Sequence, residues 1–318
     1  MTVKRARRAP SRSLISTFVF VVSLVLVARF ALVECGASLA PKGAATTPEP
    51  HGGEHGTAAA EHPPPRSAPS PQGSAARASD LASVHLTLGI PRDADPSDDQ
   101  LLDEHSFVVS YSPTKRVPNW VAWRLDRSYL GHAKRKNDFR PDPALPAELY
   151  HVSESDYLHS GYDRGHMCPS ADREDTPADN SLTFLFTNME PQLHELNAGP
   201  WERFEEYERQ RAERGAVLYI VAGGVFSAPF PTIGQGVAVP AANFKIMVVL
   251  GDGQKATDVA ESTEVVSVLM PNERGVGEHP WTDFLTSVDA VEQATGYDFL
   301  DAVPERVQRV IEARTAHP

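Results

Sequence analysis

The chain has 318 residues and a formal net charge of −12, with 42 Asp and Glu residues against 30 Lys and Arg residues. A net negative charge excludes attraction of nucleic acid by the overall charge of the protein. Binding of a polyanion would therefore need a local basic surface. The two cysteines, Cys35 and Cys168, provide neither a disulfide framework nor a cysteine-based metal site. We expect Cys168 to be a small packing residue.

Residues 1–40 have the pattern of an export signal. Five basic residues and no acid within the first twelve are followed by an uncharged apolar run from Leu14 to Ala28. The apolar character continues past Arg29, and residues 14–33 approach the ~20 residues that a membrane-spanning helix needs. We favour a cleaved signal peptide, with a signal anchor as the alternative and a mitochondrial presequence as a poorer match. The basic N-terminus predicts an exported domain, secreted or periplasmic, or held outside the membrane by the anchor.

Residues 41–80 read as a disordered linker. They consist mostly of Ala, Pro, Gly, Ser, Glu and His, with almost no large apolar side chain to bury. The remaining residues, 82–318, contain enough apolar segments for one domain with a real core.

The domain opens with two predicted strands and a basic stretch. β-branched and aromatic residues alternate in residues 106–112 and 119–126, on either side of a short loop. Between Lys115 and Arg140, eight Lys and Arg residues stand against two Asp residues, a local charge of +6. Such a stretch suits a phosphate-bearing substrate, and an ordinary solvated face is the alternative.

The next segment, "SGYDRGHMCPSADR" at residues 160–173, reads neither as a helix nor as a clean strand. It places Asp163, Arg164 and His166 within four residues. The apolar run at residues 181–189 predicts a strand, and the segment from Pro200 to Gly215 has helical spacing with a suitable start and end.

The C-terminal part contains three further predicted strands and two predicted helices. The strands cover residues 216–223, 242–251 and 263–271, and the helices cover residues 279–296 and 303–314. Strands that come in groups, with helices between and after them, predict an α+β fold with a mixed sheet rather than alternating βαβ units.

Cleavage of a phosphodiester bond requires three groups that this part of the chain supplies. An imidazole such as that of His166 can take a proton from water at neutral pH. A guanidinium such as that of Arg164 can hold the charge that gathers on the phosphorus oxygens. The amide oxygen of Asn197 can help to hold a divalent ion for the leaving oxygen, because Mg²⁺ takes few protein ligands. A helix cap is an alternative role for Asn197.

The segments "YDRGHMCPSADR", "FLFTNMEPQ" and "LNAGPWERFE" together resemble the DNA/RNA non-specific endonuclease family of ββα-metal (His-Me finger) nucleases. They occur in the order of the family and at its spacing, and a looser likeness runs from His85 to "ATGYDFL" near the C-terminus. The resemblance implies a mainly antiparallel sheet with packed helices and a ββα-metal motif.

The resemblance also implies roles for individual residues. His166 corresponds to the general base and Arg164 to the arginine that stabilises the phosphate. Asn197 corresponds to the metal ligand, Glu205 to an acid that orients metal-bound water, and Asn188 to a position that helps to align the imidazole. We expect Asp163 to brace its loop, and we name Arg140 and Lys136 as further phosphate contacts whose register the basic stretch leaves open.

The sequence therefore predicts an exported endonuclease that depends on Mg²⁺, with Mn²⁺ or another divalent cation as substitutes, and that cuts DNA and RNA with little sequence preference. Two alternatives stay open. One is a non-catalytic extracellular module that binds nucleic acid through the basic stretch, and the other is a phosphodiesterase for a smaller diester. No protein partner can be inferred.

Overall fold

The computed structural model describes residues 83–318. The predicted signal or anchor at residues 1–40 and the predicted linker at residues 41–80 lie outside the described residues. Within residues 83–318, no helix is long and apolar enough to cross a membrane.

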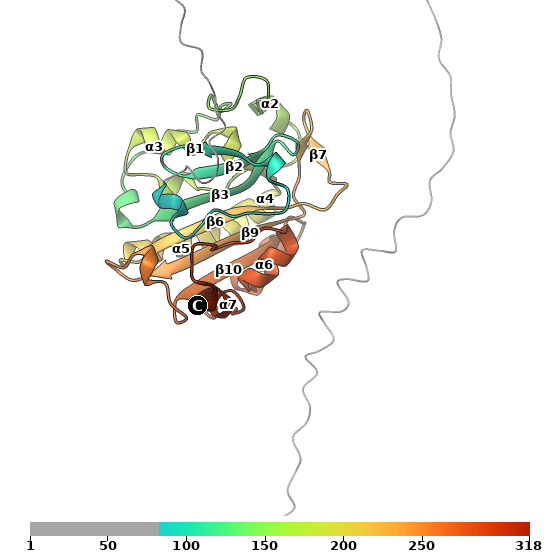
Figure 1. The fold of residues 1–318 in the computed structure, drawn as a ribbon. Helices are drawn as coiled ribbons and strands as arrows, with labels where there is room; N and C mark the ends of the chain where they lie inside the picture. Colours follow the sequence, from blue (N-terminus) through green and yellow to red (C-terminus); the bar gives the residue numbers. More distant parts are fainter. Residues whose placement is uncertain (1–82) are drawn as a thin grey trace, which may run out of the picture. The chain divides into compact units, whose positions relative to one another are not determined.

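A seven-stranded sheet forms the centre of the domain, and every pair of neighbouring strands in it is antiparallel (Figure 1). In spatial order its strands are β1 (Gln100–Asp103), β2 (Val108–Ser112), β3 (Val117–Leu125), β6 (Val217–Val225), β9 (Ala242–Leu250), β10 (Glu264–Pro271) and β11 (Leu285–Thr286). The predicted α+β fold with a mainly antiparallel sheet is confirmed.

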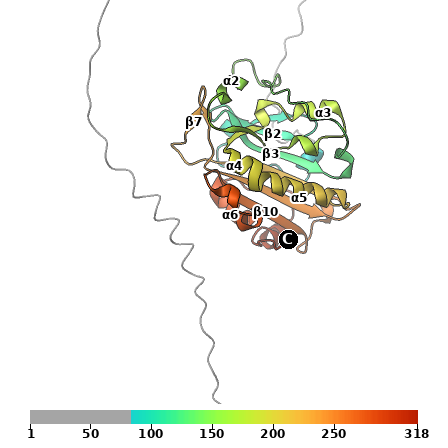
Figure 2. The ribbon, with the colours of Figure 1, turned by 180° about the vertical axis from the view of Figure 1, so that it is seen from behind.

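The two faces of the sheet are buried by different helices. Along β3, Trp123 faces one apolar cluster and Trp120 faces the other, as the alternation of side chains in a strand requires. Helix α5 (Glu202–Glu213) packs on the Trp123 face, and helices α6 (Val288–Thr295) and α7 (Glu305–Ile311) pack on the Trp120 face. Figure 1 shows the α6 and α7 side, and Figure 2 shows the α5 side from behind. The burial of each large apolar side chain contributes about 1.5–3 kcal/mol to this packing.

Besides several 3₁₀ turns, a small two-stranded sheet, a small hairpin and three short α-helices lie outside the large sheet. Their bounds are β4 (Asp163–His166) with β5 (Met189–Gln192), β7 (Thr232–Ile233) with β8 (Val237–Ala238), α2 (Glu154–Tyr157), α3 (Pro177–Leu182) and α4 (His194–Leu196). The pair β4 and β5, followed by α4 and α5, forms the strand, strand and helix unit that the resemblance implied.

Three local expectations need correction. The segment around Arg164 contains a strand, β4, because it finds a partner in β5. The strand predicted at residues 181–189 is instead the end of α3 and a 3₁₀ turn, with β5 beginning only at Met189. The α-helix predicted at residues 279–296 begins only at Val288, where Ser287 caps its start by accepting from the N–H of Ala290, and Trp281–Phe284 form a separate 3₁₀ turn.

Candidate active site

The two-stranded sheet of β4 and β5 positions the motif that holds Arg164 and His166. In its antiparallel register Arg164 faces Pro191 and His166 faces Met189. Gly165 stands between the two functional residues, and a Cβ atom built on it would overlap the buried side chain of Gln192 on the facing strand. A glycine at this position therefore leaves room for the buried side chain of Gln192.

His166 is buried among aromatic rings. Its carbonyl accepts a hydrogen bond from Nε1 of Trp201 (3.2 Å), and the ring of Phe184 meets the imidazole edge-on at a centroid distance of 5.1 Å. Nε2 is buried without a hydrogen-bond partner among the described residues, which leaves Nδ1 as the nitrogen that can reach water. Burial, and after it the charges of Arg135 and Arg164, lower the pKa of His166 to about 3. The imidazole is therefore neutral at neutral pH, the form that a general base requires.

Asn197 lies where α4 gives way to a short π-helical turn, Asn197–Trp201, that leads into α5. Gly199 breaks helical geometry inside this turn, and such turns are frequent at functional sites. Nδ2 of Asn197 donates to Oδ2 of Asp163 (3.0 Å), and Nδ1 of His194 lies 2.8 Å from the same oxygen. Because the amide nitrogen is committed to Asp163, the amide oxygen of Asn197 stays available to a ligand.

Two hollows of about 390 and 410 Å³ share Arg135, Arg164 and Asn197 in their walls, and we call them together the groove. His166 and Glu205 line the second hollow. The structure thus brings the predicted base, arginine, metal ligand and acid to one open surface, although they come from β4, the π-helical turn and α5.

The guanidinium of Arg164 is held at the edge of the groove by two neighbours. Its Nη1 donates to Oε1 of Glu154 (2.8 Å), and its carbon lies 4.1 Å from the centroid of the Phe139 ring. The ring fixes the plane of the guanidinium. The partner carboxylate is largely exposed to solvent, so a phosphate oxygen can replace it.

Glu205 contacts a buried group of charged side chains. The nearest cation is Nζ of Lys245, which is fully buried, 3.7 Å from Oε1 of Glu205 and 3.3 Å from Oε2 of Glu208. The same ammonium lies 4.3 Å from the centroid of the Trp201 ring. Burial raises the pKa of Glu205 to about 7, and the charges of Lys245 and Arg209 oppose this rise. Lys245 therefore favours the carboxylate form of Glu205.

Three predicted residues do not line the groove. Asn188 is fully buried, and its side chain bonds both backbone groups of Cys168 and the carbonyl of Thr183, each at 2.9 Å. It fixes the backbone just after His166 and acts as a positioning residue. Nη1 of Arg140 donates to Asp138 and to the carbonyl of Ser181. The side chain of Lys136 is exposed outside the two hollows.

Three of the eight basic residues of this stretch are neutralised by nearby acids and do not gather at the groove. Lys115, Arg124 and Arg140 pair with Asp98, Asp126 and Asp138. Arg135 is the member of the stretch that lines both hollows, with Nη1 donating to Oγ of Ser170 (2.6 Å). The predicted phosphate contacts Arg140 and Lys136 therefore lie outside the groove, whereas Arg135 of the same stretch lines it.

Arg209 is a second residue that sequence reasoning missed. It lines the second hollow and its Nη1 lies 3.3 Å from Oδ1 of the buried Asp172. Its position could have been predicted from the spacing, because Arg209 follows Glu205 by four residues in α5 and so lies on the same side of the helix.

These residues fit a divalent cation. The groove offers the amide oxygen of Asn197 and several carboxylates, among them that of Glu205, beside open space for water and substrate phosphate. Oxygen ligands in small number suit Mg²⁺, which keeps several of its waters.

Comparisons with known proteins identify the family of the chain. A family model described as DNA/RNA non-specific endonuclease matches residues 87–306. A nuclease of Nostoc sp. is 43% identical over 237 residues, which cover 73% of this chain and 86% of that protein. The mitochondrial nuclease EXOG of Danio rerio is 32% identical over 241 residues, covering 71% of this chain and 67% of that protein.

The fold also has a counterpart among solved structures. A crystal structure of the EndoG/EndoGI complex, which describes the mechanism of EndoG inhibition, contains a chain with a TM-score of 0.63 and 24% identity, covering 73% of this chain and 96% of that one. The chain belongs to the DNA/RNA non-specific endonuclease family. It is a nuclease, a hydrolase of phosphodiester bonds, and the non-catalytic alternative is set aside.

Proposed function

We propose that the protein is an exported, Mg²⁺-dependent endonuclease that cuts DNA and RNA with little sequence preference and leaves a 5′-phosphate. The observation that carries the proposal is the groove, where a neutral buried imidazole, a free amide oxygen and a guanidinium face the same space. Mn²⁺ or another hard cation would also suit this ligand set.

In this proposal each residue has a distinct task. Nδ1 of His166 takes the proton from a water molecule as that water attacks phosphorus. Arg164 leaves Glu154 and, with Arg135, holds the phosphate oxygens on which negative charge gathers. Trp201 keeps the backbone of His166 in place through its hydrogen bond to the carbonyl.

The amide oxygen of Asn197 would hold the divalent ion, and Glu205 would accept hydrogen bonds from the water around it. When bound, the ion supplies Lewis-acid stabilisation of the departing 3′-oxygen. The buried ammonium of Lys245 favours the carboxylate form of Glu205. Contacts of this kind reach the sugar-phosphate backbone and carry no sequence information, which supports cleavage with little sequence preference.

The proposal is tested with purified full-length protein on plasmid DNA, on RNA and on a small aryl phosphodiester, with Mg²⁺ and with EDTA. We expect His166→Ala to lose at least about 100-fold in rate on both polymers, as removal of a general base commonly does. Asn197→Ala should require much more Mg²⁺ for the same rate. His279→Ala, which changes an exposed histidine outside the groove, is the matched control.

Undiminished cleavage of plasmid by His166→Ala would refute the assignment of the base. If the protein cleaves the small diester but neither DNA nor RNA, a phosphodiesterase for small substrates is favoured. Export is tested separately by fractionation of cells that express the chain with and without residues 1–40.

A further inference from the structure

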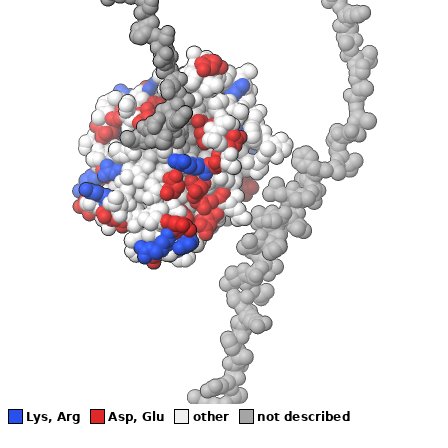
Figure 3. Space-filling view, viewed as in Figure 1, with Lys and Arg blue, Asp and Glu red and all other residues white. Residues whose placement is uncertain are grey.

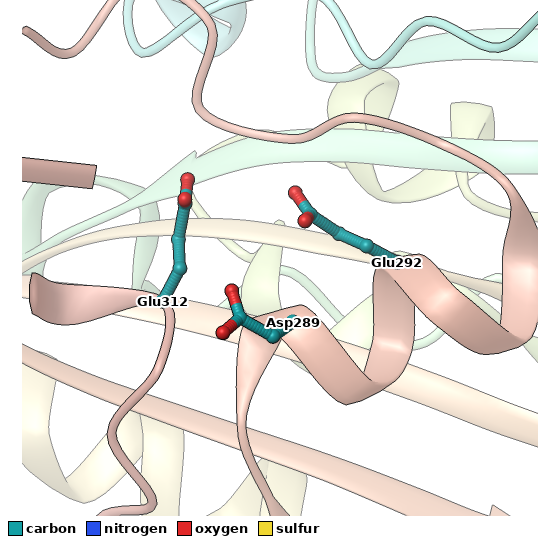
Figure 4. Close-up of side chains that lie close together, drawn as sticks. All are labelled: Asp289, Glu292 and Glu312. Atoms are coloured by element: carbon teal, nitrogen blue, oxygen red, sulfur yellow. The ribbon is translucent and has the colours of Figure 1, made fainter. Parts of the chain in front are cut away.

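Three carboxylates converge on the side of the sheet that α6 and α7 cover. Asp289 and Glu292 belong to α6, and Glu312 follows α7 directly. One oxygen from each lies within 4.8 Å of the others, and Figure 4 shows the three side chains pointing toward one another. Figure 3, which views this side of the domain, shows Asp and Glu side chains gathered around α6.

Glu312 is the member of this cluster that an ordinary acidic surface does not explain. It is only 7% exposed, and its Oε1 is buried with no hydrogen-bond partner among the described residues. A buried carboxylate without a partner is costly and is normally paired with a cation or a donor. Glu292 differs, because its Oε1 accepts a hydrogen bond from the N–H of Phe299 (3.0 Å).

The charged groups around Glu312 add further negative charge to this part of the domain. The charged groups that act on it are Glu292, Asp289 and Asp298, all of them acids. Burial, followed by these neighbours, raises the pKa of Glu312 to about 8. The described residues therefore supply negative charge to this place and no positive charge to balance it.

The backbone holds the three carboxylates in place. The N–H of Asp289 donates to the carbonyl of Glu312 (3.2 Å), so the start of α6 is tied to the residue that ends α7. The side chains of Val288, Val291 and Ile311 are buried in the same apolar cluster. The carboxylates need no rearrangement of the helices in order to share a ligand.

We propose that Asp289, Glu292 and Glu312 bind a hard divalent cation, with Ca²⁺ as the best match, and that this ion fastens α7 to α6. Oxygens bound to one Ca²⁺ at about 2.3–2.6 Å can lie up to about 5 Å apart, which fits the observed span. Water would complete the coordination on the exposed side of Asp289. The site lies on the other face of the sheet from the groove, so its role is structural and separate from cleavage.

The test follows the thermal unfolding of the full chain during titration with Ca²⁺ at constant ionic strength, with Tb³⁺ luminescence as a second readout. An Asn197→Ala background removes the candidate ligand in the groove, so that a response reports on the carboxylate cluster. At a Ca²⁺ concentration 100 times Kd we expect the Tm to rise by roughly 5–10 °C.

Glu312→Gln should abolish this rise and the Tb³⁺ signal while keeping the shape of the side chain. Glu305→Gln is the matched control, because Glu305 is an exposed glutamate of the same helix that pairs with Arg309. It should retain the full response. The proposal would be overturned if the Tm of the parent protein did not change with Ca²⁺, or if the Tm of the Glu312→Gln variant rose as much as that of the parent. Neither result depends on nuclease activity.

Discussion

At the scale of single residues, the ion pair between Arg164 and Glu154 has a direct consequence for substrate binding. The guanidinium faces the groove, whereas the side chain of Glu154 is 71% exposed. A phosphate that binds Nη1 of Arg164 must displace this carboxylate. Glu154 therefore acts as a competitor for the arginine and opposes the approach of a polyanion.

We predict that Glu154→Gln tightens substrate binding. Loss of an exposed ion pair changes the free energy by up to about 1 kcal/mol, so the KM for a DNA oligonucleotide should fall by up to about five-fold. The effect should shrink as salt increases. Glu148→Gln removes the same charge from a nearby exposed position and serves as the control. An equal change in both variants would show that net charge, and not release of Arg164, is responsible.

Single residues also show where the sequence was informative. The fold brings His166, Arg164, Asn197 and Glu205 to one groove. The first three were predicted from the chemistry of their side chains, and Glu205 was predicted only through the resemblance to the family. Arg135 was not distinguishable from Arg140 or Lys136, because six neighbouring residues offer three cations and only the path of the backbone decides which one faces the groove. Asn188 was recognised by position, but its hydrogen bonds to Cys168 are visible only in three dimensions.

At the scale of elements, the short strands β4 and β5 depend on one glycine. Gly165 lies between Arg164 and His166, and an added methyl group would overlap the buried side chain of Gln192. Since β4 has only four residues, a disturbance at this point would shift both functional side chains together.

We predict that Gly165→Ala destabilises the protein by about 1–3 kcal/mol and reduces the rate of cleavage, as overpacking of a buried site does. Removal of the obstacle in Gly165→Ala/Gln192→Ala should restore part of the loss. Chemical denaturation of both single variants and the double variant gives the coupling energy. Additive effects would mean that the two side chains do not meet.

The elements that sequence patterns predicted well are the long ones. Strands β3, β6, β9 and β10 each have eight or nine residues, and their apolar periodicity extends over enough positions to be distinctive. The predictions for residues 181–189 and 279–296 were wrong because side-chain to backbone hydrogen bonds from Asn188 and Ser287 set the backbone there, and apolar spacing does not reveal such bonds.

At the scale of the whole molecule, several buried glutamates link stability to pH. Burial, and then the neighbouring Asp142, raises the pKa of Glu104 to about 8, and burial raises the pKa of Glu190 to about 8. In the unfolded chain such groups lose their protons near the ordinary value of about 4.3. The folded state thus retains protons that the unfolded state has lost, and the stability that these groups contribute declines as pH rises from that value through 8.

We predict that the free energy of unfolding decreases between pH 6 and pH 9, with about 2 kcal/mol of the decrease due to Glu104. Glu104→Gln cannot ionise and should flatten the decrease, measured by urea unfolding at several pH values. Glu148→Gln, at an exposed position, should keep the slope of the parent. A Glu104→Gln variant with an unchanged slope would show that Glu104 ionises normally in the folded state.

The division of the sheet into two differently covered faces also suits this protein to attachment on a solid support. Val310 is an apolar side chain of α7 that is 40% exposed, and α7 lies on the face turned away from the groove. The thiol of Cys168 is fully buried, and burial raises its pKa to about 12, so it would not compete with a cysteine introduced at position 310. Once Cys35 is also replaced by Ser, molecules coupled to a bead through position 310 would all present the groove outward to polymer in the surrounding solution.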